Sequence, residues 1–284
     1  MERAARVVEH RLPRSVLCVV ERAPDPSCAP WVRACFGYEE RAAAPLVKHE
    51  FANTSVVVIF EIGTPIEVGE GAQAARRVGG FVARIHERPT RTAFSGHQLG
   101  VELLLSPLAA HFVFGVPPAD LAQRVVSASD LLPREQRDLP VRLGELASWD
   151  DRLDAVERFV ANARRAKPPA ALRELAWAVA EIERHAGRVR IAALARELGW
   201  SERRLERAFA ENVGVSPKLF ARLARFEALM AHVHSGASAN WADAALALGY
   251  ADQSHLVRDV RQFAGVPPTL AEAQTLGVGR TAVA

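Results

Sequence analysis

Two stretches in the last third of the chain share one pattern: ARELGWSERRLERAFAENVGVSP at residues 195–217 and ALALGYADQSHLVRDVRQFAGVPP at residues 245–268. Each contains Leu-Gly, an aromatic residue and a polar residue suited to begin a helix. A leucine follows with an arginine two positions later, and Gly-Val-x-Pro ends the stretch. The second copy has one extra residue between its glycine and that leucine. The repeat predicts one supersecondary unit built twice.

The first copy predicts two helices joined by a short turn. Its first helix has an apolar stripe formed by Ile191, Leu194, Ala195 and Leu198. Gly199 can adopt the left-handed conformation that ends this helix, and Ser201 can cap the next one. On that second helix Leu205 and Phe209 share the inner face, while the outward positions are Arg203, Glu206 and Arg207. A polar second helix after a turn containing glycine is the helix-turn-helix pattern.

The second copy repeats this design with different outward residues. Gly249 ends its first helix, Asp252 caps the second, and the outward positions are Ser254, Val257, Arg258 and Arg261. The amphipathic connector 217–234 predicts a long helix that holds the two units in a fixed relation. When the second helices of the two units lie about 34 Å apart, they can enter successive turns of the major groove on one face of DNA.

Positive charge gathers around the first copy. Residues 184–225 hold ten basic and four acidic residues, a net charge of +6, whereas residues 226–284 carry −2 and the whole chain +3. A local basic patch suits a polyanionic partner. The same arginines are equally compatible with a solvated helix face, so charge alone leaves both interpretations open.

The first half has a different character, which predicts a β-rich domain. Short runs rich in Val, Ile, Leu, Phe and Thr predict strands at 15–21, 45–51, 54–62, 81–86, 90–95 and 101–105. Helices are predicted to begin at Pro107 and to cover 118–126 and 140–165. Residues 164–169 interrupt the pattern and predict a linker. Further helices are predicted at 170–186, 190–198, 202–212, 217–234, 240–248, 253–263 and 268–274.

The predicted class is therefore α+β with several domains. A β-rich domain with flanking helices occupies 1–165, an all-helical domain with two helix-turn-helix units occupies 166–275, and 276–284 is a flexible tail. No apolar run is long enough to span a membrane, and the N-terminus does not resemble a secretion signal, so a cytoplasmic location is expected. Cys18, Cys28 and Cys35 are predicted to be reduced thiols rather than disulfide or zinc ligands.

Residues 247–268 resemble the C-terminal signature of the DNA-binding domain of AraC/XylS-type regulators. Together with the first copy, the resemblance to this domain covers about 172–274. One departure is Val260, where that family usually has phenylalanine. The first half more loosely resembles the cupin-like sensor domains of this family, in particular the DUF6597 kind, on the segments 45–51, 97–108 and 113–117. The resemblance implies a bacterial, cytoplasmic transcription regulator of double-stranded DNA, expected to be an activator with RNA polymerase as a further partner.

The resemblance implies that the second helix of each unit reads bases. The base-reading candidates are Arg203, Glu206, Arg207, Gln253, Ser254, Val257 and Arg258. Arginine can bind guanine, glutamine adenine and glutamate cytosine through their hydrogen-bonding groups. The phosphate-contacting candidates are Ser201, Arg204, Lys218, Arg222, Arg225, His255 and Arg261. For each outward arginine the alternative is a solvated salt bridge.

The expected function is a sequence-specific regulator controlled by an unidentified small-molecule effector in the first half, with homodimerisation open. The chain is not expected to be an enzyme or to hold a cofactor, because His49, His86, His97 and His111 are spread singly and do not form a cupin metal motif. The alternatives are a cupin-type enzyme with an autoregulatory DNA-binding domain, and a DNA binder indifferent to sequence. Metal analysis and DNA selection distinguish them.

Overall fold

The computed structural model describes residues 5–28, 31–69, 75–121, 125–163, 170–235, 241–274 and 281–283. The chain forms two compact units. The first comprises 1–47, 55–84 and 91–167, and the second comprises 48–54, 85–90 and 168–284. The first is rich in strands and the second in helices, which confirms the mixed class predicted from the sequence. The linker predicted at 164–169 lies outside the described residues.

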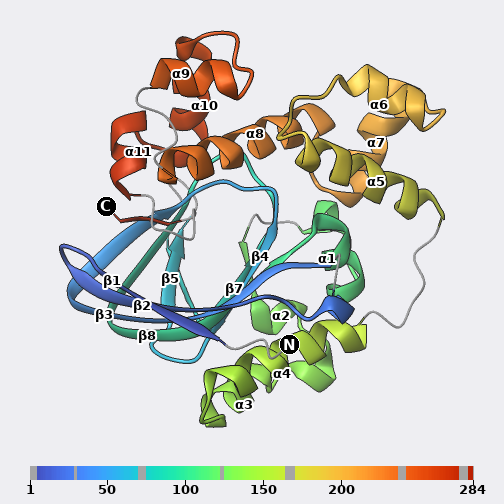
Figure 1. Ribbon diagram of the computed structural model, residues 1–284. Coiled ribbons are helices and arrows are strands. Elements are labelled where there is room, and N and C mark those ends of the chain that lie inside the picture. The colour runs from blue at the N-terminus through green and yellow to red at the C-terminus, as the bar shows by residue number, and fades with distance from the viewer. Residues whose placement is uncertain are drawn as a thin grey trace. The chain divides into compact units, whose positions relative to one another are not determined.

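The strands form one sheet with the order β1-β2-β3-β8-β4-β7-β9 (Figure 1). Strand β5 pairs with β6 and β8, and β10 pairs with the end of β3. The bounds are β1 Arg6–Arg11, β2 Ser15–Arg22, β3 Val32–Glu50, β4 Val56–Glu61, β5 Ile66–Gly69, β6 Arg76–Val78, β7 Gly80–Ala83, β8 Thr90–Leu105, β9 Val125–Ser127 and β10 Thr281–Val283.

Strand β4 is buried on both faces, which explains its continuous apolar sequence. It lies antiparallel between β7 and β8. Val56, Val58 and Phe60 point into the larger core of the first unit, whereas Val57 and Ile59 belong to a smaller cluster on the opposite face. Successive side chains of a strand point to opposite faces, so a strand covered on both sides needs apolar residues at every position.

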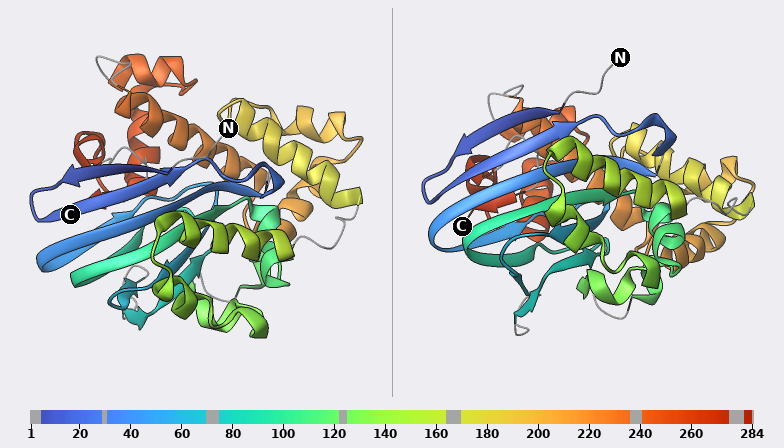
Figure 2. Two further views of the ribbon diagram at one scale, coloured as in Figure 1. Left: turned by 60° about the horizontal axis from the view of Figure 1, so that its bottom comes forward. Right: turned by 90° about the horizontal axis from the view of Figure 1, so that it is seen from below.

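Helices cover one face of this sheet (Figure 2). They are α1 Pro107–Phe114, α2 Ala128–Leu131, α3 Leu139–Glu145 and α4 Trp149–Ala163. The side chain of Arg22 on β2 is buried against α4, where it pairs with Asp150, Asp154 and Glu157 at 2.6–3.2 Å. Because the guanidinium is almost fully enclosed, these carboxylates satisfy a charge that would otherwise be costly to bury.

The described cysteines are free thiols, and burial raises the pKa of Cys35.

The first unit departs from the sequence prediction in several places. Residues 118–126 are not one helix, because a 3₁₀ turn at Pro118–Asp120 is followed by strand β9. The helix predicted over 140–165 is two helices, because Leu146 has an extended backbone and Ser148 caps α4. Strand β3 runs for 19 residues, whereas only its end had been predicted, as part of a strand at 45–51. Strand β8 is one strand where two had been predicted, at 90–95 and 101–105, and β1, β5, β6 and β9 were not predicted.

The second unit follows the sequence prediction closely. Its helices are α5 Ala170–Arg184, α6 Ile191–Glu197, α7 Glu202–Asn212, α8 Pro217–His234, α9 Trp241–Ala247, α10 Gln253–Ala264 and α11 Pro268–Gln274. Each helix begins and ends within two residues of the bounds predicted from the sequence. The tail predicted to be flexible lies mostly outside the described residues, but Thr281–Val283 forms β10 and pairs antiparallel with Lys48–Glu50.

Helix α8 connects the two helix groups of the second unit (Figure 1). Near its start the ring of Phe220 packs edge-on against Phe209 of α7, with ring centroids 5.9 Å apart. Six residues later the ring of Phe226 packs against Phe263 of α10, with centroids 5.5 Å apart. All four rings are fully buried or nearly so. Both helix-turn-helix units are therefore anchored to one helix.

The end of α5 approaches α8 closely at Gly187. This glycine has a left-handed φ of 69°, and a Cβ there would overlap the carbonyl oxygen of Ala221. Its own carbonyl accepts a hydrogen bond from Nη2 of Arg225 at 3.0 Å. Only glycine combines this backbone conformation with such close contact.

We predict that Gly187→Ala destabilises the second unit more than Gly199→Ala does. Both glycines have nearly the same φ, 69° and 65°, but a Cβ on Gly199 would meet no atom within 4 Å. The Gly199 variant therefore measures the backbone strain alone, about 1–2 kcal/mol. The Gly187 variant adds the clash, which we expect to lower the thermal midpoint by several further degrees in calorimetry of the full chain. Equal losses in the two variants would contradict this packing.

Candidate nucleic-acid interface

The two helix-turn-helix corners close with the same backbone hydrogen bonds. In the first, Trp200 N–H donates to the carbonyl of Ala195 at 2.8 Å, and in the second Tyr250 N–H donates to Ala245 at 2.9 Å. Gly199 and Gly249 are left-handed, with φ of 65° and 72°. This is the Schellman arrangement that satisfies the last carbonyls of a helix. The internal repeat therefore corresponds to one repeated three-dimensional corner.

The aromatic residue of each corner and the cap that follows it fix the next helix. Trp200 and Tyr250 are both buried. Oγ of Ser201 accepts a hydrogen bond from Arg204 N–H at 3.2 Å, and Oδ1 of Asp252 accepts one from His255 N–H at 2.7 Å. Side-chain caps of this kind satisfy N–H groups that have no partner inside the helix. The helices α7 and α10 therefore begin at defined residues.

Helix α7 presents a polar outer face. Leu205 and Phe209 are fully buried on its inner face, whereas Arg203, Glu206 and Arg207 are exposed. Arg207 forms a long ion pair with Glu211, its Nε lying 3.9 Å from Oε1, and both side chains are mostly exposed. A pair of this length between exposed side chains contributes little, so the guanidinium can exchange it for another acceptor.

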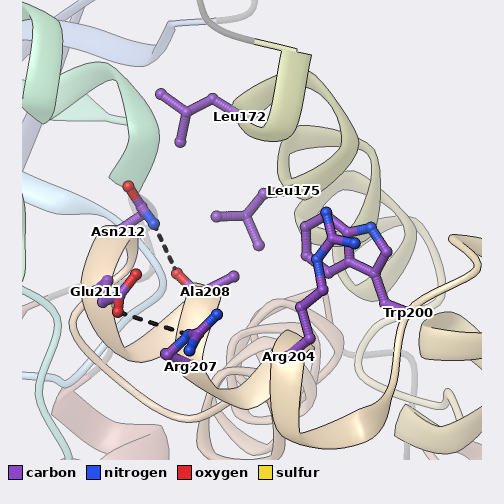
Figure 3. Close-up of a pocket in the computed structure, with 8 residues that line it drawn as sticks. All are labelled: Leu172, Leu175, Trp200, Arg204, Arg207, Ala208, Glu211 and Asn212. Atoms are coloured by element: carbon purple, nitrogen blue, oxygen red, sulfur yellow. Dashed lines mark hydrogen bonds and ion pairs between the residues drawn. The ribbon is translucent and has the colours of Figure 1, made fainter.

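Arg204 lies on the flank of α7 rather than on its outer face. Its guanidinium stacks on the ring of Trp200 at 4.1 Å from the centroid and lies 3.9 Å from a carboxylate oxygen of Glu174. A hollow of about 130 Å³ lies on this flank between α5 and α7, with Leu172 and Leu175 on one side (Figure 3). Stacking on a buried tryptophan restrains the arginine, so that its charge is held beside the helix.

Helix α10 presents a different outer face. Leu256, Val260 and Phe263 are fully buried, so the valine at position 260 does fill the inward site. Three of the base-reading candidates on α10 are exposed and the fourth, Val257, is half-buried; the exposed ones are Gln253, Ser254 and Arg258. His255 is half-buried, with its ring edge-on to Tyr250 at 5.3 Å and Nε2 3.9 Å from Oδ2 of Asp259.

Apart from His255, the phosphate candidates fall into two groups. Ser201, Arg204, Lys218 and Arg261 are exposed. Arg222 and Arg225 are half-buried and engaged inside the unit. Arg222 Nη2 donates to Oδ1 of Asp259 at 2.6 Å and to Oε1 of Gln262 at 2.7 Å, whereas Arg225 donates to Gly187 and lies over the ring of Tyr250. The phosphate contacts predicted for these two arginines stay predictions, and their positions favour a role in holding the helices.

Asp259 was not singled out by the sequence analysis. Its side chain is 1% exposed, and its partner Arg222 comes from α8. Burial, and then the nearby charge of Asp259, raise the pKa of Tyr250. A signal for Asp259 was present in the sequence, because residues 256, 259, 260 and 263 fall on one face of the helix. A carboxylate on an otherwise apolar stripe indicates a buried charge that needs a cationic partner.

Two of the four histidines considered as metal ligands, His86 and His97, have other polar partners. Nε2 of His97 lies 3.0 Å from a carboxylate oxygen of Glu39, and Nε2 of His86 lies 3.1 Å from Oγ1 of Thr90. The hydrogen bond from Arg41 and the contact with His97 lower the pKa of Glu39. Among the residues that the structure describes, no three His, Cys, Asp or Glu side chains are grouped as metal ligands, and no helix is both long and apolar enough to cross a membrane.

We predict that Asp252→Asn increases the affinity of the chain for DNA. Asparagine caps a helix as well as aspartate does, and the substitution removes a negative charge from the start of α10. We expect binding to tighten a few-fold at low salt, by removal of repulsion from phosphates. The control is Asp252→Ala, which removes the same charge but also the cap. Binding measured by fluorescence anisotropy that weakens in both variants would contradict the prediction.

Comparisons with known proteins agree with this geometry. The sequence model of a helix-turn-helix domain family matches residues 194–272, which include both corners. No curated protein matches the chain. Solved structures of ToxT from Vibrio cholerae are similar in fold: an apo form has 8% identity and a TM-score of 0.50 and covers 84% of this chain and 96% of that one.

Two further solved structures are more distant. A form of ToxT with bound unsaturated fatty acid has 9% identity and a TM-score of 0.48, covering 84% of this chain and 94% of that chain. The AraC-like transcriptional activator CuxR has 15% identity and a TM-score of 0.26, covering 79% and 80%. The duplicated corner, the exposed polar helices α7 and α10 and the matched family lead to one identification. Residues 194–272 are a helix-turn-helix domain of the AraC type, and the chain is a DNA-binding transcription regulator.

Proposed function

We propose that the regulator reads two separate blocks of bases, one with α7 and one with α10. The observation that carries this proposal is the recurrence of one exposed arginine at the same place in both units. Arg207 and Arg258 each follow the buried leucine of their helix by two positions, and both are exposed. An exposed arginine on the outer face of such a helix can bind guanine O6 and N7 with two hydrogen bonds.

The neighbours of these arginines give the two helices different specificities. On α7 we assign base contacts to Arg203, Glu206 and Arg207, with glutamate suited to the amino group of cytosine. On α10 we assign them to Gln253, Ser254, Val257 and Arg258, with glutamine suited to adenine and valine to the methyl group of thymine. Unequal outer faces support sequence-specific binding to an asymmetric site, because a sequence-indifferent binder needs only charge.

The remaining exposed polar groups are suited to the DNA backbone. We assign phosphate contacts to Ser201, Arg204, Lys218, His255 and Arg261. Arg204 supports this assignment best, because Trp200 holds its charge on the flank of α7 beside the base-reading face. Contacts to phosphate fix the register of the protein on DNA but carry no direct sequence information.

We further propose that a small molecule bound by the first unit controls DNA binding, and that the chain acts in the cytoplasm. Support comes from the fold, since the likeness to ToxT extends over both units. Contact with RNA polymerase and formation of a homodimer are part of the same proposal, and sedimentation of the protein with and without DNA tests the dimer. Metal analysis of the purified protein tests the alternative of a cupin-type enzyme, which requires a bound metal.

We predict that Arg207→Ala and Arg258→Ala each relax one block of the preferred DNA site. Wild-type protein should select two short blocks about one helical turn apart from a random pool. Each variant should lose preference in one block, and a different one, with binding to the best site about 10–100-fold weaker. The control is Arg184→Ala, which removes an exposed arginine from α5. Failure of wild type to enrich any motif would contradict sequence-specific reading.

We predict that an effector changes DNA affinity by about 5–150-fold, the usual range of coupling between two sites. The protein is titrated with apolar carboxylates, neutral sugars and organic amines. Calorimetry measures binding of each compound, and the dissociation constant for DNA, measured with and without it, identifies the chemical class of the effector. Coupling is reciprocal, so protein already bound to DNA must bind the same effector with an affinity changed by the same factor. A compound that binds the first unit and leaves the dissociation constant for DNA unchanged is not the effector, and a panel without any active class argues against ligand control.

A further inference from the structure

Two short segments from the N-terminal half of the chain are part of the second unit. They are Lys48–Thr54, at and beyond the end of β3, and Ile85–Thr90, which leads into β8. The first segment is deeply buried there, with Phe51 3%, Ala52 1% and Thr54 3% exposed. Residues buried to this degree are integral to a core rather than laid on its surface.

Both segments contact the C-terminal end of α10. Ala52 N–H donates to the carbonyl oxygen of Phe263 at 2.9 Å, and so satisfies one of the carbonyls that a helix end leaves without a partner. The ring of Pro89 packs directly against Gly265, the left-handed residue that ends α10, so closely that a Cβ added to Gly265 would lie 2.8 Å from Cγ of Pro89. The ring of Phe51 packs edge-on against Phe226, which in turn packs against Phe263.

Polar contacts connect the same segments to α8. Oγ1 of Thr54 donates to Oε2 of Glu227 at 2.6 Å, and Thr54 N–H donates to Oε1 of the same carboxylate at 3.3 Å. From the second segment Glu87 accepts a hydrogen bond from Gln262 at 3.1 Å. Gln262 itself accepts from Arg222, which holds the buried Asp259 of α10. The angle between α8 and α10 therefore depends on residues from both segments.

The end of α7 is closed differently. Val213 N–H and Gly214 N–H both donate to the carbonyl of Phe209, at 2.8 and 3.0 Å, and the chain continues directly into α8 through the cap Ser216. The end of the first reader helix, α7, is thus closed by residues next to it in the sequence. The end of the second reader helix, α10, also contacts residues far away in the sequence, as the hydrogen bond from Gln262 to Glu87, 175 positions apart, shows.

From this asymmetry we infer that the segments Lys48–Thr54 and Ile85–Thr90 are a positioning element for the second reader helix. They determine recognition of the block of bases read by α10 and leave the block read by α7 unaffected. Phe51 and Thr54 are positioning residues, because they act through Phe226, Phe263 and Glu227 and do not touch DNA. The inference rests on the proposed function, since it needs two separately read blocks.

The test compares the full-length protein with Thr54→Val, Thr54→Ser and Phe51→Leu. Three DNA duplexes are used: the selected site, the site with its first block scrambled and the site with its second block scrambled. The ratio of dissociation constants measures discrimination at each block. Phe81→Leu is the matched control, because Phe81 has the same 3% exposure as Phe51 but lies in the core of the first unit. Thermal unfolding verifies that each variant is folded.

We expect Thr54→Val and Phe51→Leu to reduce discrimination at the second block about fivefold or more, with the first block changed by less than about twofold. Thr54→Ser keeps the hydroxyl group and should retain wild-type discrimination. Phe81→Leu should leave discrimination at both blocks unchanged. Equal losses at both blocks show a merely structural role and overturn the inference, as does full retention at both. If wild type itself discriminates at neither block, the proposed function fails, and this outcome is distinct from the others.

Discussion

The arrangement of the DNA-binding half depends on aromatic packing against a single helix, α8. Phe220 contacts the first reader helix through Phe209, and Phe226 contacts the second through Phe263. These two positions are six residues apart, so an α-helix separates them by about 9 Å along its axis and rotates them by about 240°. Neither reader helix can turn without disturbing a ring that is 0–1% exposed. The spacing of two phenylalanines therefore helps to set the relation between the two helices that face DNA.

The two units share a backbone design but differ in the charges that support them. The corners, with their left-handed glycines and buried aromatic residues, are the same in both. Around the second corner, Arg225 lies over the ring of Tyr250, and Arg222 holds the buried carboxylate of Asp259. If either Arg222 or Asp259 is replaced by a neutral residue, the other charge stays in place without its partner. The loss of stability is then larger than the net contribution of the pair. Two of the ten basic residues in 184–225 that made this region appear suited to a polyanion are thus engaged inside the unit, and the exposed positive surface is smaller than the sequence suggests.

The helical half could be predicted almost completely from sequence because its determinants are local. Caps such as Ser201, glycines such as Gly199 and the stripe of Leu205 and Phe209 all lie within a few residues of the feature they specify. The β-rich half was predicted less well because strand pairing is not local. Strand β3 includes residues 32–42, which no local pattern had predicted, since β2 pairs with it from Cys35 to Ala42. Among the site residues, outward positions followed from helical period, whereas Phe51 and Glu227 acquire their roles only from contacts between distant parts of the chain.

A ligand in the first unit can alter DNA binding only through a difference in free energy between two arrangements of the reader helices. A tenfold change in affinity requires about 1.4 kcal/mol of such a difference. One covalent path available for it is short, because β3 passes from the first unit at Val47 into the second at Lys48 and ends four residues before Thr54. The hydrogen bond from Thr54 to Glu227 and the packing of Phe51 are each of the required magnitude. A displacement of β3 by a bound ligand would therefore change the position of α10 before that of α7. The ligand would alter recognition of the block of bases read by α10 more than recognition of the block read by α7.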